Sequence, residues 1–398
     1  MNTSRYLLLC LCILSIFSCQ KDQQQIVEEI HLYYTKQERE ILAQDLNLPS
    51  YPFNYRLEIP AHLGSLTINT NNSLATLGRV LFYDKNLSAN GKVSCASCHK
   101  PELAFADNVA FSEGFNGQLT KRNSLSLGSF PSFQKYYGDP ALVLTNPGFF
   151  WDERASSVSE QSRLSLEDPI EMGTALHELE EKLLSKEYYQ VLFLRAFIER
   201  ERAWNREMYL PEHFDADVTL ALEAFVNSIG VFETRFDEGF ASHRSMEKAF
   251  SNFSEAENVG KDLFNQHCSG CHNLSNASAT QITVADNGLD KKYTDLGVGG
   301  VLGIETQNGL FKVPMLRNIA LTAPYMHDGR FATLEQVVNH YSSGVNDSPN
   351  LHHLLRWPNG QAVQFNWSEE KKAALVAFLR TLTDEQTLKA EKYSDPFQ

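Results

Sequence analysis

The chain has 398 residues, of which 42% are hydrophobic, a composition that is ordinary for a soluble globular protein. Its length predicts two or three domains. The formal net charge of −14 argues against a nucleic-acid partner, because binding to phosphates requires a basic surface. The same charge permits a basic protein partner, although a solvated acidic surface explains it equally well.

The N-terminus has the features of an export signal. Arg5 precedes the apolar run Tyr6–Phe17, which is too short to span a bilayer comfortably. Because Ile16-Phe17-Ser18-Cys19 resembles a bacterial lipobox, we interpret residues 1–19 as a lipoprotein signal peptide and expect a lipid on Cys19 that attaches the protein to a membrane. Simple secretion without a lipid is the alternative. Both interpretations predict an exported protein in the periplasm or cell envelope of a Gram-negative bacterium.

The segment that follows is expected to contain little regular structure. Residues 20–60 are polar and then rich in Pro and Tyr, so we expect a tether followed by an extended lead-in. A helix is predicted to begin near Asn72, because Leu74, Leu77 and Leu81 then share one face.

Two Cys-x-x-Cys-His motifs contain every cysteine beyond the export signal. They are Cys95-Ala96-Ser97-Cys98-His99 and Cys268-Ser269-Gly270-Cys271-His272. Two thiols at this spacing can each add to one vinyl group of a haem, and the imidazole that follows can bind the iron. We therefore expect two haem c groups, attached through Cys95, Cys98, Cys268 and Cys271, with His99 and His272 as iron ligands.

Other uses of paired cysteines explain the sequence less well. A zinc ribbon also contains two Cys-x-x-Cys pairs, but these are typically about 15–20 residues apart. A thioredoxin-like motif would account for one pair and not for its copy. Disulfide bonds suit an exported protein but leave both histidines unexplained.

The rest of the chain predicts helices. Residues 174–240 carry apolar residues at helical spacing and no catalytic signature. The capping box Ser254-x-x-Glu257 should begin a helix that ends at the second motif, and Ser368 should cap another near the C-terminus. Small c-type cytochromes enclose haem between such helices. We therefore predict an all-α fold of two cytochrome c-like domains, 61–245 and 246–398, each with one covalently attached haem c.

The ligand at the sixth coordination position of a haem iron determines whether the haem only transfers electrons or also binds a reactant. Between His99 and Glu171 the sequence contains no His and no Met, the strong sixth ligands. Unless a remote segment reaches in, the first iron should keep an open position that a peroxide can occupy. Peroxide cleavage also needs a group that moves a proton, and Glu171 is the candidate, with Gln161 as a hydrogen-bonding companion. By sequence alone each is more often a solvated surface residue.

Six segments, in the same order along the chain, resemble the bacterial dihaem cytochrome c peroxidases and the related MauG-type enzymes, which oxidise tryptophans in a partner protein. The resemblance extends from about residue 74 to 382. The segments are Leu77-Gly78-Arg79-x-Leu81-Phe82-x-Asp84-x-x-Leu87-Ser88, Val93-Ser94-Cys95-x-x-Cys98-His99, Arg122-Asn123, Trp151-Asp152-x-Arg154, Phe311-Lys312-Val313-Pro314-x-Leu316-Arg317-Asn318 and Leu321-Thr322-Ala323-Pro324-Tyr325-Met326-His327.

The resemblance implies roles for several residues. Glu171 matches the family's acid-base carboxylate and Gln161 its amide partner. Trp151 matches the indole between the two haems, a stepping stone for electrons, although packing in a core is the plainer explanation.

A calcium site between the domains is also implied by the resemblance, at Asn123, Thr322 and Pro324. One amide oxygen and backbone carbonyl oxygens are ligands that suit this hard cation.

Two positions depart from the peroxidases. A His that often blocks the first iron is replaced by Phe115, so we expect that iron to be open without reductive activation. An axial Met of the second haem is replaced by Tyr341, which shares a helical face with Leu334 and Val338 and should point inward. The alternatives are His340, about 100° round the helix, Met326, and a tyrosine that only packs. A phenolate ligand would favour higher oxidation states and resembles the MauG-type branch.

These observations predict a cytochrome-c peroxidase-type oxidoreductase that reduces hydrogen peroxide to water. Its electrons would come from a small donor protein, a cytochrome c or a cupredoxin, through the second haem. Oxidation of aromatic residues in a partner protein is the first alternative, and a dihaem electron carrier without chemistry is the second. The sequence also allows the protein to form a homodimer.

Overall fold

The structure is a computed structural model. The residues that it describes are 34–64, 67–127, 148–203, 208–274 and 282–397. The predicted signal peptide, with Cys19 and its lipid, lies outside the described residues and stays a prediction. No helix in the described ranges has both the length and the apolar character needed to cross a bilayer.

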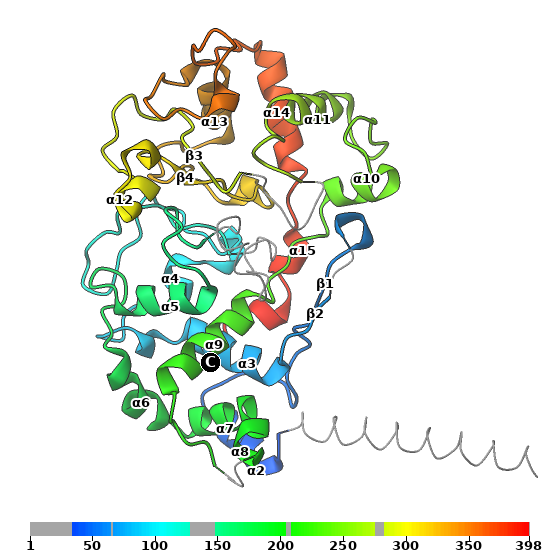
Figure 1. Cartoon of the computed structure of the whole chain (residues 1–398). Helices are drawn as coiled ribbons and strands as arrows, with labels where there is room; N and C mark the ends of the chain where they lie inside the picture. Colours follow the sequence, from blue (N-terminus) through cyan, green and yellow to red (C-terminus); the bar gives the residue numbers. More distant parts are fainter. Residues whose placement is uncertain (1–33, 65–66, 128–147, 204–207, 275–281, 398) are drawn as a thin grey trace, which may run out of the picture.

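The described chain is mostly helical, as predicted (Figure 1). The helices of the first half are α2 (Lys36–Leu42), α3 (Asn72–Tyr83), α4 (Cys95–Cys98), α5 (Val158–Glu167), α6 (Leu176–Leu184), α7 (Glu187–Ala196), α8 (Ile198–Ala203), α9 (Phe214–Val226) and α10 (Arg235–His243). Those of the second half are α11 (Glu255–His267), α12 (Val298–Leu302), α13 (Leu334–Asn339), α14 (Glu369–Arg380) and α15 (Glu385–Leu388). Two short antiparallel pairs, β1 (Leu57–Glu58) with β2 (Thr67–Ile68) and β3 (Val284–Ala285) with β4 (Phe311–Lys312), complete the regular structure.

Local capping signals place several helices where the sequence predicts them. Asn71 caps α3, and Ser254 with Glu257 forms the capping box of α11. Ser368 caps α14. The extended lead-in expected over 20–60 is interrupted by α2, because Thr35 and Glu38 form a second capping box and Leu42 is buried in the first core. The sequence analysis did not recognise this box.

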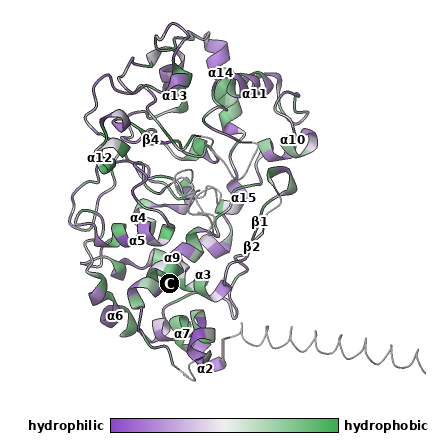
Figure 2. Ribbon diagram, viewed as in Figure 1, coloured by the Kyte–Doolittle hydropathy of each residue, from purple (hydrophilic) through white to green (hydrophobic). Residues whose placement is uncertain are grey.

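The first hydrophobic core forms where α3 crosses α9 and α7. Gly78 of α3 makes this crossing possible, since a Cβ at that position would lie 1.8 Å from the carbonyl oxygen of Ala221. The helix backbones therefore touch, and Phe225, one turn after Ala221, closes over the contact. Helices such as α6 and α14 carry both hydrophobic and hydrophilic residues, as expected for helices at the edge of a core (Figure 2).

The second core repeats this arrangement with different residues. Here α11, which leads into the second motif, packs against α14. A Cβ at Gly260 would lie 1.9 Å from the carbonyl oxygen of Ala374, and Phe378 follows Ala374 by one turn. Each half thus places one Cys-x-x-Cys-His motif after a helix that a glycine holds against a partner helix.

The last residues of the chain return to the first core instead of staying with the second. Tyr393 is buried there, and its hydroxyl donates to Ser228 O at 2.6 Å. Arg79 Nε donates to Ser394 O at 2.8 Å. In Figure 1 the chain runs from α14 through α15 down to the helices of the first half. The predicted division into 61–245 and 246–398 stays a prediction, and it assigns to the second domain a segment that packs in the first core.

The contact at Gly260 predicts a measurable loss of stability on adding one methyl group. Gly260→Ala should lower the free energy of unfolding by about 1–3 kcal/mol, because α11 and α14 must move apart to admit the Cβ. Denaturant unfolding followed by circular dichroism measures this change. Val259→Ala, at the neighbouring exposed position of α11, is the control and should leave stability almost unchanged. Equal stability of both variants would contradict the close contact.

Candidate haem sites and the inter-haem cavity

The first motif holds its histidine in the orientation that an iron ligand needs. α4 carries Cys95 and Cys98, and the N–H of His99 donates to Cys95 O at 2.9 Å. His99 Nδ1 lies 2.8 Å from Phe105 O, so its proton is held there and Nε2 is left for a metal. Burial lowers the pKa of His99, which keeps the imidazole neutral at pH 7.

The second motif has the same geometry. The N–H of His272 donates to Cys268 O at 2.9 Å, and His272 Nδ1 lies 2.9 Å from Pro314 O. Burial lowers the pKa of His272 to about 4. The four thiols of the two motifs form no disulfide bonds. Free thiols paired with a neutral, oriented imidazole are the donor set that covalent haem requires, so the residues of both motifs fit haem c.

A cavity of about 790 Å³ lies beside the first motif. Its lining brings together the predicted residues Gln161, Glu171, Trp151 and Asn123 with His99. These residues come from segments far apart in the sequence, so it is the fold that brings them together at one site. No His other than His99 lines this cavity in the described part of the chain, but Met315 does. The search between His99 and Glu171 could not reveal this methionine, so the open first iron stays a prediction.

Glu171 is partly buried and is held by its main chain. Its N–H donates to Asp168 Oδ1 at 3.1 Å, and its carbonyl accepts from the N–H of Phe115 at 3.0 Å. Burial raises the pKa of the Glu171 carboxyl, and Asp168 raises it further. Ser165, through a hydrogen bond, and Arg154, through its charge, lower it. A carboxyl with a raised pKa accepts a proton at higher pH than an exposed one does.

Gln161 reaches the cavity from α5, where the sequence analysis missed one further residue. Gln161 Nε2 donates to Ser165 Oγ at 3.0 Å, and Ser165 also lines the cavity. The sequence signal that could have identified Ser165 is its position four residues after Gln161, because residues four apart lie on the same face of a helix.

Phe115 lies where the family often has a histidine. A Cβ at Gly173 would lie 2.3 Å from the Phe115 ring, so this ring packs closely against the turn that carries Glu171. It offers no atom to a metal, in agreement with the sequence.

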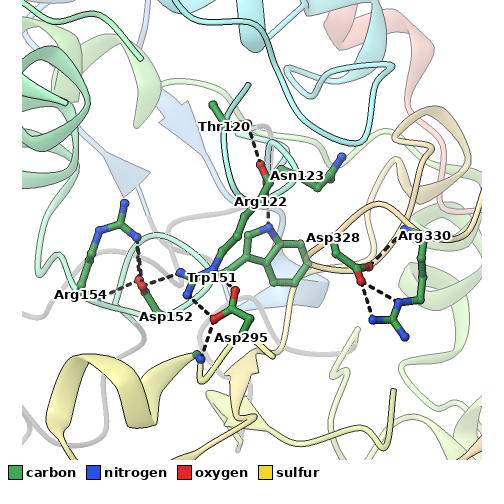
Figure 3. Close-up of polar contacts among 10 residues, drawn as sticks. Thr120, Arg122, Asn123, Trp151, Asp152, Arg154, Asp295, Asp328 and Arg330 are labelled. Atoms are coloured by element: carbon green, nitrogen blue, oxygen red, sulfur yellow. Dashed lines mark hydrogen bonds and ion pairs between the residues drawn. The ribbon is translucent and has the colours of Figure 1, made fainter. Parts of the chain in front are cut away.

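Trp151 connects the surroundings of the two motifs. Its indole Nε1 donates to Asn123 O at 2.9 Å (Figure 3), and the next residue, Ser124, has its Oγ 3.2 Å from His99 Nδ1. The Trp151 carbonyl accepts from the N–H of Lys312 at 2.7 Å. Two residues later, Pro314 binds the histidine of the second motif. One tryptophan is therefore tied to the loops that hold both histidines.

A network of ion pairs surrounds this tryptophan and joins the two halves (Figure 3). Arg122 Nε and Nη2 donate to Asp295 at 2.7 and 2.8 Å, and Arg122 Nη1 donates to Asp152 at 2.5 Å. Arg154 Nη1 donates to Asp152 at 2.9 Å. Bidentate geometry fixes the guanidinium of Arg122 and therefore the relative position of the loops at the cavity.

Near the second motif, one asparagine contacts all three candidates for the sixth ligand. Asn287 Nδ2 donates to Tyr341 Oη at 3.3 Å and to Met326 Sδ at 3.6 Å. His340 Nε2 lies 3.0 Å from Asn287 O. Burial raises the pKa of Tyr341 to about 12, with smaller increases from Cys271 and Cys268, so a phenolate here would require a nearby cation.

The helix that carries Tyr341 departs from the expected geometry. α13 ends at Asn339, and His340–Gly344 form a π-helical turn. The wider turn buries His340 as well, whereas a continuous α-helix was expected to turn it about 100° away. Its imidazole is nevertheless directed to the asparagine carbonyl.

Of the predicted calcium ligands, Asn123 contacts the segment that follows Thr322 and Pro324 in the chain. The N–H of Asn123 donates to His327 O at 2.8 Å, next to the loop of Thr322 and Pro324. Asn123 Nδ2 donates to Val109 O at 3.1 Å, which leaves its amide oxygen as the atom that could bind a cation. The calcium site stays a prediction.

Known proteins are similar to this chain in sequence and in fold. A family model described as "Di-haem cytochrome c peroxidase" matches residues 72–245. The methylamine utilization protein MauG of Methylorubrum extorquens is 32% identical over 78% of each chain. The cytochrome c551 peroxidase of Nitrosomonas europaea is 31% identical, over 79% of this chain and 81% of its own. The crystal structure of a MauG-like protein associated with microbial copper homeostasis matches with a TM-score of 0.67 and 30% identity, over 88% of this chain and 98% of that protein. The chain is therefore an oxidoreductase that belongs to the di-haem cytochrome c peroxidase and MauG family.

Proposed function

We propose that this protein is a peroxidase that reduces hydrogen peroxide to water with electrons delivered through the second haem. The observation that carries the proposal is the shared cavity of His99, Gln161 and Glu171. When bound, haem c supplies an iron that coordinates the oxidant and exchanges electrons. The motif residues that would hold the two groups are Cys95, Cys98, His99, Cys268, Cys271 and His272.

The polar side chains of the cavity handle the proton. Reduction of one peroxide to two water molecules consumes two electrons and two protons. Gln161, whose amide is fixed by Ser165, would orient the peroxide. The Glu171 carboxylate would take the proton from one peroxide oxygen and deliver it to the other, so that water is the leaving group. Its raised pKa supports this exchange.

Trp151 would carry electrons between the two sites, since it is hydrogen-bonded to both loops that hold the motif histidines. The electron donor would be a small cytochrome c or cupredoxin. Asn123, Thr322 and Pro324 would bind one calcium ion that stabilises the loops around this tryptophan.

Three further features complete the proposal. The boundary between the two haem domains would lie near residue 245, and the C-terminal segment would join them. The protein would be exported to the periplasm or cell envelope and held at a membrane by a lipid on Cys19. It would act alone or as a homodimer.

MauG-type oxidation of aromatic residues in a partner protein is a second candidate. Tyr341 favours it, because this phenol is partly buried near the second motif and its Oη accepts from Asn287. A phenolate on the second iron would make the second haem a poorer acceptor from an ordinary cytochrome. A third candidate, an electron carrier without chemistry, does not explain the carboxyl and amide in the cavity.

Turnover with a donor separates the first two candidates. The proposed peroxidase should oxidise two reduced cytochrome c or cupredoxin molecules for each peroxide, measured by donor absorbance under steady state. A protein that reacts with peroxide but turns over no donor would instead act on a partner protein. An unchanged spectrum on adding peroxide would leave only the electron carrier.

Replacing the carboxyl tests the proton transfer. Glu171→Gln should lower the rate constant for reaction with peroxide about 10²–10⁴-fold, because the proton carrier is lost while the size of the side chain is kept. Stopped-flow absorbance measures this rate. Glu167→Gln, a partly exposed carboxyl at the end of α5, is the control and should react like the wild type. An equal rate in Glu171→Gln would remove this residue from the mechanism.

Replacing the phenol tests the second site. Tyr341→His should change the electron paramagnetic resonance spectrum of one resting haem to that of a bis-nitrogen centre and raise its reduction potential. Tyr325→Phe, which removes another buried phenol of this half, should leave both properties unchanged. An unaltered spectrum in Tyr341→His would show that this tyrosine only packs.

A further inference from the structure

Ser165 lies between the two polar groups of the cavity. It follows Gln161 by four residues in α5, so the two side chains leave the helix on the same side. Gln161 Nε2 donates to its Oγ at 3.0 Å. The same hydroxyl lowers the pKa of the Glu171 carboxyl. All three side chains line the cavity beside His99.

The main chain of Glu171 is fixed without help from Ser165. Asp168 Oδ1 accepts from its N–H, and the N–H of Phe115 donates to its carbonyl. Gly114 allows the two segments to touch, because a Cβ there would lie 1.6 Å from Ile170 O. The backbone of the turn is therefore held in place, and these contacts leave the carboxylate itself to be oriented by the side chains around it.

Charged residues line the cavity, and two of them, Asp168 and Arg154, shift the pKa of the Glu171 carboxyl. Asp168 on the same turn raises its pKa, and Arg154 from the loop before α5 lowers it, less than Ser165 does. Arg154 is already bound to Asp152. The residues that α5, described in full, contributes to the cavity are uncharged, namely Val158, Gln161 and Ser165. Ser165 thus offers the carboxylate a neutral hydroxyl from α5, and this hydroxyl lowers the pKa of the carboxyl.

We propose that Ser165 is a positioning residue that joins Gln161 and Glu171 into one hydrogen-bonded unit. Its oxygen accepts from the Gln161 amide, and its hydrogen is donated to the Glu171 carboxylate. A hydroxyl can do both at once, since it has one donor and two acceptor positions. The unit keeps the Glu171 carboxylate ready to accept a proton and fixes which side of the Gln161 amide faces the cavity. This inference rests on the proposed role of Glu171.

Cyanide binding to the oxidised holoprotein tests the inference without turnover. Hydrogen cyanide must lose its proton to bind, so the association rate depends on whether Glu171 can accept that proton. The rate should show an inflection with pH that Glu171→Gln removes. Ser165→Ala should move this inflection to higher pH by roughly half to one unit, the loss expected for one hydrogen bond to the carboxylate. Ser165→Thr, which restores the hydroxyl, should return the inflection towards the wild-type pH.

Ser159→Ala is the matched control. It removes a hydroxyl from the same helix, but that hydroxyl donates to Thr219 Oγ1 at 2.8 Å and does not line the cavity. Its inflection should equal that of the wild type. Covalent haem content confirms that each variant folds, and Ser165→Cys, of similar size with a weak donor, replaces Ser165→Ala if the latter loses haem.

The outcomes distinguish the inference from the proposed function. If Glu171→Gln removes the inflection but the Ser165 variants leave it in place, Ser165 is not a positioning residue and the role of Glu171 stands. If the inflection survives Glu171→Gln, Glu171 is not the proton acceptor, and both proposals fail.

Discussion

Both haem sites depend on one repeated interaction, the hydrogen bond between a histidine Nδ1 and a backbone carbonyl. Phe105 O holds His99 and Pro314 O holds His272, at nearly equal distances of 2.8 and 2.9 Å. This bond selects the tautomer with a free Nε2 and fixes the plane of the ring. Neither carbonyl belongs to the motif that it serves, so the ligand geometry is set by loops and through them by the fold around Trp151.

The helices that precede the two motifs, α3 and α11, contact their partner helices through backbone atoms, because a side chain at the contact would hold the helices apart. A glycine in the helix before each motif lies against the carbonyl of a partner helix, with a phenylalanine one turn on. Such contacts tolerate almost no increase in volume, because protein interiors are close-packed. One such helix pair precedes each motif, so backbone contact between helices fixes where each motif begins.

The cavity places a partly buried carboxyl where stability alone would not favour one. Burial disfavours the charged form of Glu171, and the surrounding structure offers a hydroxyl and a shared arginine instead of a dedicated cation. A fully paired carboxylate would be a poor proton acceptor. The incomplete compensation is consistent with a group that changes protonation during a reaction.

The sequence by itself determined the features that depend on neighbouring residues. The two motifs, the capping box of α11 and the cap of α14 are local, because a thiol pair or a serine hydroxyl acts within four residues of its own position. Tertiary structure alone decided the rest. Local sequence made Glu171 a candidate but could not separate it from a solvated surface residue, and the family resemblance supplied its expected role. Ser165 and Asn287 were missed. The return of Tyr393 to the first core and the π-helical turn at His340 had no sequence signal that we recognised. Their contacts join segments up to about three hundred residues apart in the chain, and such pairings are chosen by packing and burial of the whole molecule, which no local pattern encodes.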